Sequence, residues 1–138
     1  MIRALKIGTD GTVEAMEVHP KWDSLAHKIG CEYIEQVSIM NPKYKMTGKP
    51  YVMLVDEEGL MKEDFVLNPV ASFLYDTMKH GNPIVGNALV VGVGPSSEGG
   101  RYTDHGDVSF TAMAKMLGDL NERLKSSGLY HKLQKRIV

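Results

Sequence analysis

The start of the chain alternates hydrophobic and polar residues in two short runs that predict a β-hairpin. Residues 2–7 and 13–18 place apolar side chains at roughly every second position, with charged side chains between them. A strand that is buried on one face shows this period of two. Thr9-Asp10-Gly11-Thr12 lies between the runs, and Asp-Gly in that place is a strong hairpin signal. We therefore expect two antiparallel strands.

After Pro20 the hydrophobic period changes to that of a helix. Apolar residues recur three and four positions apart between residues 21 and 29. They are Trp22, Leu25, Ala26 and Ile29. This spacing places them on one face of a short amphipathic helix, and Gly30 is suited to end it.

A second pair of strands is predicted from residues 33–39 and 51–55. The polar stretch between them contains Asn41-Pro42, Gly48 and Pro50. It is about ten residues long, which is long for a hairpin loop. We expect the two runs to pair in the same sheet as the N-terminal hairpin.

Asn68 and Pro69 predict the start of another helix, because asparagine caps a first turn and proline is tolerated within it. Its buried stripe is Val70, Phe73, Leu74 and Met78, and Gly81-Asn82-Pro83 ends it. The apolar run 84–91 then predicts a buried strand or strand pair with a bulge at Gly86. We expect this run to be the central strand of the fold.

A long helix is predicted from Asp107 or Ser109, either of which could cap it, to about Gly128. Its apolar residues recur at spacings of three and four: Met113, Met116, Leu117, Leu120 and Leu124, continued by Leu129, Leu133 and Ile137. The whole pattern predicts an α+β fold, with a small, mostly antiparallel sheet, two short helices and a long C-terminal helix. We divide the chain into a compact body, residues 1–94, and a glycine-rich loop plus helical extension, residues 95–138.

The charge of the chain is nearly balanced, with 16 basic and 17 acidic residues and a formal net charge of −1. No global field would draw it to nucleic acid or a membrane, so both are unlikely partners. The charge is nevertheless separated along the chain. The middle carries Asp56, Glu57, Glu58, Glu63 and Asp64, and the last sixteen residues carry Arg123, Lys125, His131, Lys132, Lys135 and Arg136. This separation suits self-association or a foreign partner.

The single cysteine, Cys31, has no partner for an internal disulfide, and the chain begins with a strand-like run rather than a secretory leader. We therefore expect a cytoplasmic protein. Apolar runs such as 88–91 are far shorter than the ~20 residues that span a bilayer.

Three short motifs occur in a distinctive order: Met53-Leu54-Val55-Asp56-Glu57-Glu58-Gly59-Leu60, then Leu67-Asn68 with Ala71, then Ile84-Val85-Gly86-Asn87-Ala88-Leu89-Val90-Val91. Over residues 1–94 the chain resembles the domain of unknown function 3846 family. The resemblance implies a phage or mobile-element accessory protein in the cytoplasm of a bacterial host cell. No activity is assigned to that family, so the resemblance supplies no catalytic residue.

The glycine-rich segment 92–101 is the main candidate ligand site. Its exposed backbone amides could wrap a phosphate, and Ser96, Ser97 and Arg101 could add donors. The predicted ligand-binding residues are Gly94, Ser96, Ser97, Gly99, Gly100, Arg101, Tyr102, Asp104 and His105. The segment matches neither the P-loop nor the Rossmann pattern. A flexible linker is the more common use of such a sequence and is the alternative.

Other polar clusters have structural explanations. Residues 103–107 combine Asp104, His105 and Asp107, but a zinc site needs more ligands and Asp107 can serve as a helix cap. The acidic turn at residues 56–59 fits a solvated turn better than a pair of catalytic carboxylates. Cys31 fits a packed thiol better than a nucleophile. We predict no metal, no cofactor and no catalytic residue.

The function predicted from these features is that of a non-catalytic, oligomeric binder. It would sequester a small phosphorylated or nucleotide-like ligand, in a counter-defence role, with the C-terminal helix joining the subunits. The alternative is a protein-interaction module that inhibits a host protein through the apolar helix or the basic tail. A small hydrolytic enzyme using Asp104, His105 and Asp107 is the weaker third possibility.

Overall fold

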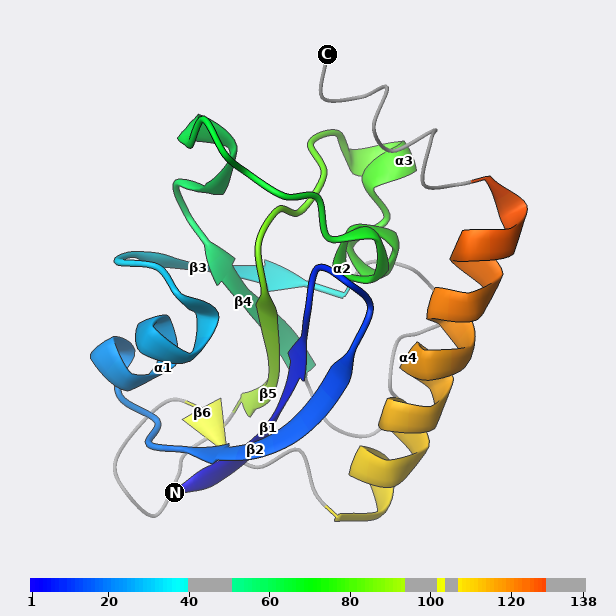
Figure 1. The fold of residues 1–138 in the computed structure, drawn as a ribbon. Helices are drawn as coiled ribbons and strands as arrows, with labels where there is room; N and C mark the ends of the chain where they lie inside the picture. The colour runs from blue at the N-terminus through cyan, green and yellow to red at the C-terminus, as the bar shows by residue number, and fades with distance from the viewer. Residues whose placement is uncertain (40–50, 94–101, 104–106, 129–138) are drawn as a thin grey trace.

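A computed structural model describes residues 1–39, 51–93, 102–103 and 107–128 (Figure 1). Its centre is an antiparallel sheet of six strands in the order β2-β1-β5-β4-β3, with β6 pairing to the end of β5. The strands are β1 Ile2–Ile7, β2 Val13–Val18, β3 Ile34–Ser38, β4 Tyr51–Asp56, β5 Ala88–Val93 and β6 Tyr102–Thr103. The helices are α1 Trp22–Ile29, the 3₁₀ turn η1 Gly59–Met61, α2 Pro69–Tyr75, α3 Thr77–His80 and α4 Asp107–Ser127. The predicted α+β class is confirmed.

The predicted N-terminal hairpin is confirmed, with β1 and β2 paired from Ile2↔Val18 to Ile7↔Val13. In its turn, an Asp10 carboxylate oxygen accepts hydrogen bonds from the backbone N–H of Thr12 at 3.0 Å and from its hydroxyl at 2.7 Å. Gly11 has φ +87°, and a Cβ at this position would overlap the Asn121 side chain of α4. The Asp-Gly signal therefore marks both a left-handed turn residue and a close helix contact.

Helices cover the two faces of the sheet unequally (Figure 1). One face packs against α2 and α4, and its core includes Leu5, Ile7, Met53, Val55, Val70, Leu74, Val90, Leu117, Leu120 and Leu124. Within the described ranges, the other packs against α1 alone, and its core includes Ile2, Ala4, Leu25, Ala26, Ile29, Leu54, Leu89 and Val91. Alternation along each strand sends neighbouring residues, such as Met53 and Leu54, to opposite faces.

The central strand is β5, as predicted, but it begins at Ala88 rather than at residue 84. Val85 instead forms an isolated bridge with Leu67, and Gly86 turns the chain with φ +75°. The amide of Asn68 holds this turn by donating to the carbonyl oxygens of Ile7 at 3.0 Å and Gly86 at 2.9 Å. These long-range bonds cannot be inferred from an apolar run.

Two helix predictions need correction. Trp22 starts α1 but is 52% exposed, so the buried face consists of Leu25, Ala26 and Ile29 only. The helix after Asn68 does not run continuously to Gly81, because Asp76 adopts φ +64° and separates α2 from α3. Asn68 does cap α2 as predicted, accepting a bond from the N–H of Ala71 at 3.1 Å.

The long C-terminal helix is present and packs onto the body of the fold. Leu117, Leu120 and Leu124 are buried in the same core as Leu5 and Val70. Gly128, with φ +75°, follows the helix as predicted. The loop at residues 40–50, the side chains of Met78 and Met113 and the apolar residues beyond Gly128 lie outside the described part. In that part no helix is long and apolar enough to cross a membrane.

Candidate functional site

A polar groove lies on the α1 face of the sheet, beside the C-terminal end of β4. The groove consists of two adjoining hollows, of about 610 Å³ and 330 Å³, which share Gly30, Asp56 and Lys62. It exists because α1 has only eight residues and ends at Gly30, where a left-handed backbone (φ +89°) turns the chain away from the sheet. One wall therefore comes from the end of α1, and the opposite wall comes from η1 and the residues after it.

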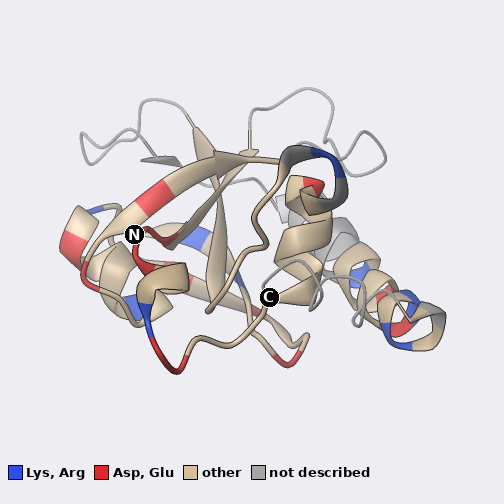
Figure 2. Ribbon diagram, turned by 90° about the horizontal axis from the view of Figure 1, so that it is seen from above, with Lys and Arg blue, Asp and Glu red and all other residues tan. Residues whose placement is uncertain are grey.

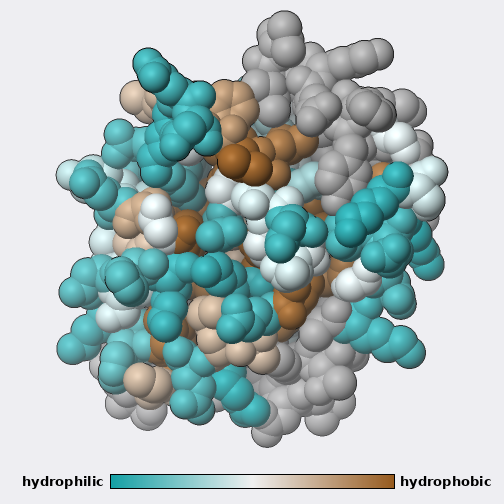
Figure 3. All heavy atoms as spheres, in the orientation of Figure 1, coloured by the Kyte–Doolittle hydropathy of each residue, from teal (hydrophilic) through white to brown (hydrophobic). Residues whose placement is uncertain are grey.

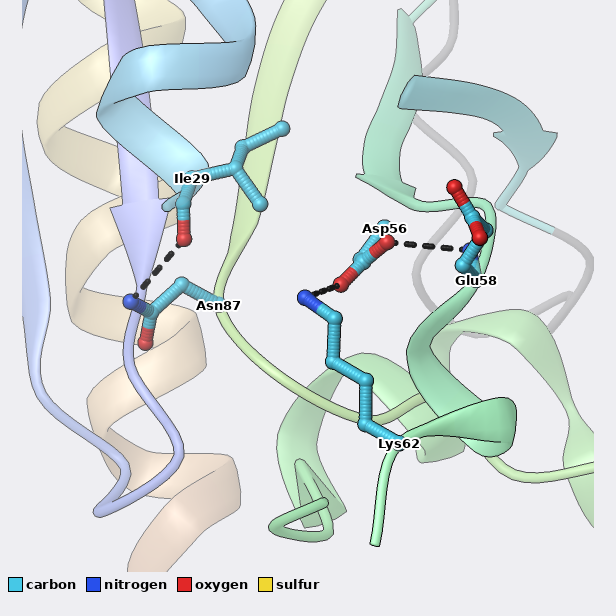
Figure 4. A network of polar contacts seen from close by, with 5 residues as sticks. All are labelled: Ile29, Asp56, Glu58, Lys62 and Asn87. Atoms are coloured by element: carbon cyan, nitrogen blue, oxygen red, sulfur yellow. Dashed lines mark hydrogen bonds and ion pairs between the residues drawn. The ribbon is translucent and has the colours of Figure 1, made fainter. Parts of the chain in front are cut away.

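Asp56 forms the floor of the groove (Figure 4). It is the last residue of β4, and alternation along the strand places its side chain on the same face as Val52 and Leu54. That side chain is only 9% exposed. One carboxylate oxygen accepts a bond from Lys62 Nζ at 2.6 Å, and the other accepts one from the backbone N–H of Glu58 at 2.9 Å. The carboxylate therefore fixes the turn between β4 and η1.

Lys62, the partner of Asp56 in this ion pair, is the more exposed of the two residues. Its side chain is 46% exposed, and the hydrogen bond with Asp56 raises the pKa of the ammonium group above its ordinary value of 10.5. The amine therefore stays protonated at neutral pH and is a poor nucleophile.

Two further contacts define the back of the groove. The Asn87 amide donates to the carbonyl oxygen of Ile29 at 3.4 Å, joining the segment that leads into β5 to the end of α1 (Figure 4). Gly59 lies so close to Val85 that a Cβ at this position would overlap it. A small residue is needed there to keep η1 against the sheet.

Cys31 lines the groove as a half-buried thiol. Burial, followed by the negative charge of Asp56, raises the pKa of this thiol from 9.0 to about 11. It is therefore protonated at neutral pH and packs against the α1-side core. The prediction of a packed thiol is confirmed.

The charged side chains that line the groove are mainly acidic. Glu32 and Glu58 line the larger hollow and Asp64 the smaller one, while Lys62 is already paired with Asp56. Among the residues that the structure describes, no three His, Cys, Asp or Glu side chains are grouped to hold a metal ion. The groove thus offers negatively charged hydrogen-bond acceptors to a ligand.

The acidic turn predicted to be solvated is only partly so. Glu57 is exposed, but Asp56 is withdrawn from solvent because it bonds to both Lys62 and the Glu58 backbone. Sequence reasoning did not pick out Lys62 or Asn87. An aspartate and a lysine six residues apart across a glycine turn were the available signal, but that spacing is too common to be specific.

The residues predicted to bind a ligand lie almost entirely outside the described part of the chain. Gly94, Ser96, Ser97, Gly99, Gly100, Arg101, Asp104 and His105 are all outside it. Tyr102 is placed only by its backbone, which pairs with Val93. Because Tyr51 pairs with Gly92 and Leu54 with Leu89, Val93 and Asp56 lie toward opposite ends of the sheet. The loop after β5 therefore begins far from the groove.

Comparison of the sequence with models of known protein families shows to which family the chain belongs. A model described as Domain of unknown function (DUF3846) matches residues 2–117. The chain belongs to the DUF3846 family. No curated protein and no solved structure gave a significant match.

The DUF3846 match extends beyond the motifs that end near residue 94. It covers the glycine-rich loop and continues to Leu117, the first buried leucine of α4. The loop and the beginning of α4 are therefore part of the DUF3846 pattern and not an addition to it. The groove residues, from His27 to Asn87, also lie within the match.

Proposed function

We propose that this DUF3846 chain is a non-catalytic binding protein that holds a small polar ligand with a positively charged group in the Asp56 groove. The observation that carries the proposal is the groove itself, with a preformed floor and acidic walls. Carboxylates accept charge-assisted hydrogen bonds from ammonium and guanidinium groups, and these are the stronger kind of hydrogen bond.

The reactive groups of the groove favour binding over catalysis. The Cys31 thiol is protonated because its pKa is raised, and the Lys62 amine is protonated for the same reason. Both oxygens of Asp56 already accept hydrogen bonds. A nucleophile or general base needs a free, correctly protonated atom in reach of the substrate, and none of these three groups supplies one.

The test is calorimetric titration with agmatine and putrescine as cationic probes and with AMP and inorganic phosphate as anionic ones. We expect the cationic probes to bind, and Glu58→Gln and Asp56→Asn to weaken binding at least tenfold, or about 1.4 kcal/mol. Glu14→Gln removes an exposed carboxylate on β2; it is the control and leaves binding unchanged. Absence of binding by both cations would overturn the proposal.

The glycine-rich loop supports a second candidate function, binding of a small phosphorylated or nucleotide-like ligand. Its glycines, serines and Arg101 have the composition of an anion-binding loop, directly after the central strand β5. Binding of AMP or phosphate that Arg101→Ala abolishes and Asp56→Asn spares would favour this site over the groove.

The proposed biological setting combines the family resemblance with ligand binding. The family resemblance implies a phage or mobile-element protein in the cytoplasm of a bacterial host, and sequestering a host signalling molecule there would give a counter-defence role. A module that inhibits a host protein is the alternative.

Self-association through α4 remains a prediction. Its leucines are used by the chain's own core, so an interface between copies would employ exposed residues such as Lys115, Asp119 and Glu122. Sedimentation of the purified chain tests this directly.

A further inference from the structure

The connection from β4 to α2 exposes an apolar patch that borders the groove. Met61 is 79% exposed, Val66 57% and Leu60 39%. Half of the large exposed hydrophobic side chains in the described part of the chain thus fall within seven consecutive residues. Hydrophobic side chains reach the surface between hydrophilic ones at this end of the molecule (Figure 3). A clustered patch of this kind marks an interaction surface more often than scattered exposed residues do.

Carboxylates surround the patch. Residues 56–64 carry five acidic side chains and one lysine, and that lysine is paired with Asp56. Figure 2 views the molecule from this end with charged residues coloured. We call the patch and the exposed carboxylates Glu57, Glu63 and Asp64 the acidic-apolar surface. A hollow of about 260 Å³ beside Leu60 and Met61, bordered by Pro83 and Ile84, continues it toward α2.

We propose that the C-terminal segment of the same chain, residues 129–138, docks on the acidic-apolar surface. The segment has matching chemistry: Lys132, Lys135 and Arg136 with no acidic residue, and Leu129, Leu133 and Ile137 spaced four apart. Its cations meet the carboxylates, and its apolar side chains cover Met61 and Val66 and enter the hollow beside Leu60. Burying both kinds of group together gives more affinity than a surface ion pair alone.

The fold brings the segment to the correct end of the molecule. Asn121 of α4 packs against Gly11, in the turn that follows Ile7, and Ile7 pairs with Ala88 beside the groove. The C-terminal end of α4 therefore lies at the same end of the sheet as η1 (Figure 1). Ten residues span up to roughly 33 Å when extended. Because the segment is covalently joined to the end of α4, docking within one chain has the effective concentration of a short linker, near millimolar, which favours it over docking between copies.

The test is limited trypsin digestion of full-length chains, with cleavage after Arg136 followed by mass spectrometry. Glu57→Lys with Glu63→Lys releases the segment, and so does Lys132→Glu with Lys135→Glu. We expect each pair to speed this cleavage about tenfold, the equivalent of about 1.4 kcal/mol of docking. Combining all four substitutions restores slow cleavage, because the charges are again complementary. Glu14→Lys with Glu17→Lys on β2 is the matched control and leaves the rate unchanged.

Three results would overturn the proposal: equally fast cleavage in wild type and both released variants, no restoration in the combined variant, or protection that grows with protein concentration. The last would assign the docked segment to a second copy. Because neither Glu57 nor Glu63 lines the groove and the other two substitutions lie in the C-terminal segment, failure here leaves the small-ligand proposal standing. Failure of agmatine and putrescine to bind likewise leaves this docking intact.

Discussion

The face of the sheet under α2 and α4 and the face under α1 differ in how completely helices cover them. On the first face, residues from three strands and two helices form an apolar core that includes the buried leucines of α4. On the second, α1 ends at Gly30 and leaves Asp56 on the floor of a groove with acidic side chains. We therefore ascribe stability mainly to the first face and the proposed ligand binding to the second, and the following substitutions test that division.

The largest expected effect comes from truncating α4 on the first face. Leu117→Ala removes a fully buried side chain and leaves a cavity, so we expect the free energy of unfolding to fall by about 2–5 kcal/mol. Urea denaturation measures it. Lys115→Ala, at an exposed position two residues away, should change the free energy of unfolding by less than about 0.5 kcal/mol. Similar effects for both substitutions would mean that α4 does not contribute to the core.

Asn68 joins the start of α2 to the end of β1 and to the turn before β5, and it should give the next largest effect. Asn68→Ala removes the α2 cap and two bonds to the carbonyls of Ile7 and Gly86, which costs roughly 2–3 kcal/mol of stability. Asn68→Ser keeps a capping oxygen and should recover part of the loss. Equal losses in the two variants, measured by denaturation, would show that the cap contributes nothing.

Lys62→Met should separate stability from binding on the second face. The pair with Asp56 is partly exposed, so its loss should cost about 1 kcal/mol or less. Removing the lysine frees the Asp56 carboxylate, so the groove becomes more acidic and agmatine should bind more tightly. Weaker agmatine binding in this variant, measured by calorimetry, would contradict the cationic ligand.

At neutral pH the smallest effect on stability is expected from the titration of Cys31, which acts only in alkaline solution. Its pKa is raised from 9.0 to about 11, so its contribution to stability is complete below pH 9 and is lost as the pH rises toward 11. At pH 8 the thiolate fraction is roughly one hundredth of that of an ordinary thiol, and alkylation by iodoacetamide should be slower in proportion. A rate like that of free cysteine would show that the thiol is not buried beside Asp56.

The hydrophobic period, together with local turn and cap residues, was sufficient to predict most of the fold. The Asp10-Gly11 turn, the Asn68 cap and the glycines at positions 30 and 128 act through local backbone chemistry, and all lie where the sequence indicates. The errors at Trp22 and Asp76 concern burial and a mid-helix break, which depend on the neighbours of each residue rather than on spacing.

The groove could not be predicted in the same way. It joins Gly30, Asp56, Lys62 and Asn87, which come from separate elements and become neighbours only when β4, β5 and the end of α1 meet. The glycine-rich loop drew attention because its composition is unusual. The groove residues have no such composition, and only the register of the sheet brings them together.

The most direct test of the central claim is an NMR titration of the ¹⁵N-labelled chain with agmatine. We predict that amide signals of Gly30, Glu58, Lys62 and Asn87 shift in a saturable way, while those of Val93 and Tyr102 at the opposite end of the sheet do not. Shifts confined to Val93 and Tyr102, or no saturable shift at all, would contradict the assignment of ligand binding to the α1 face.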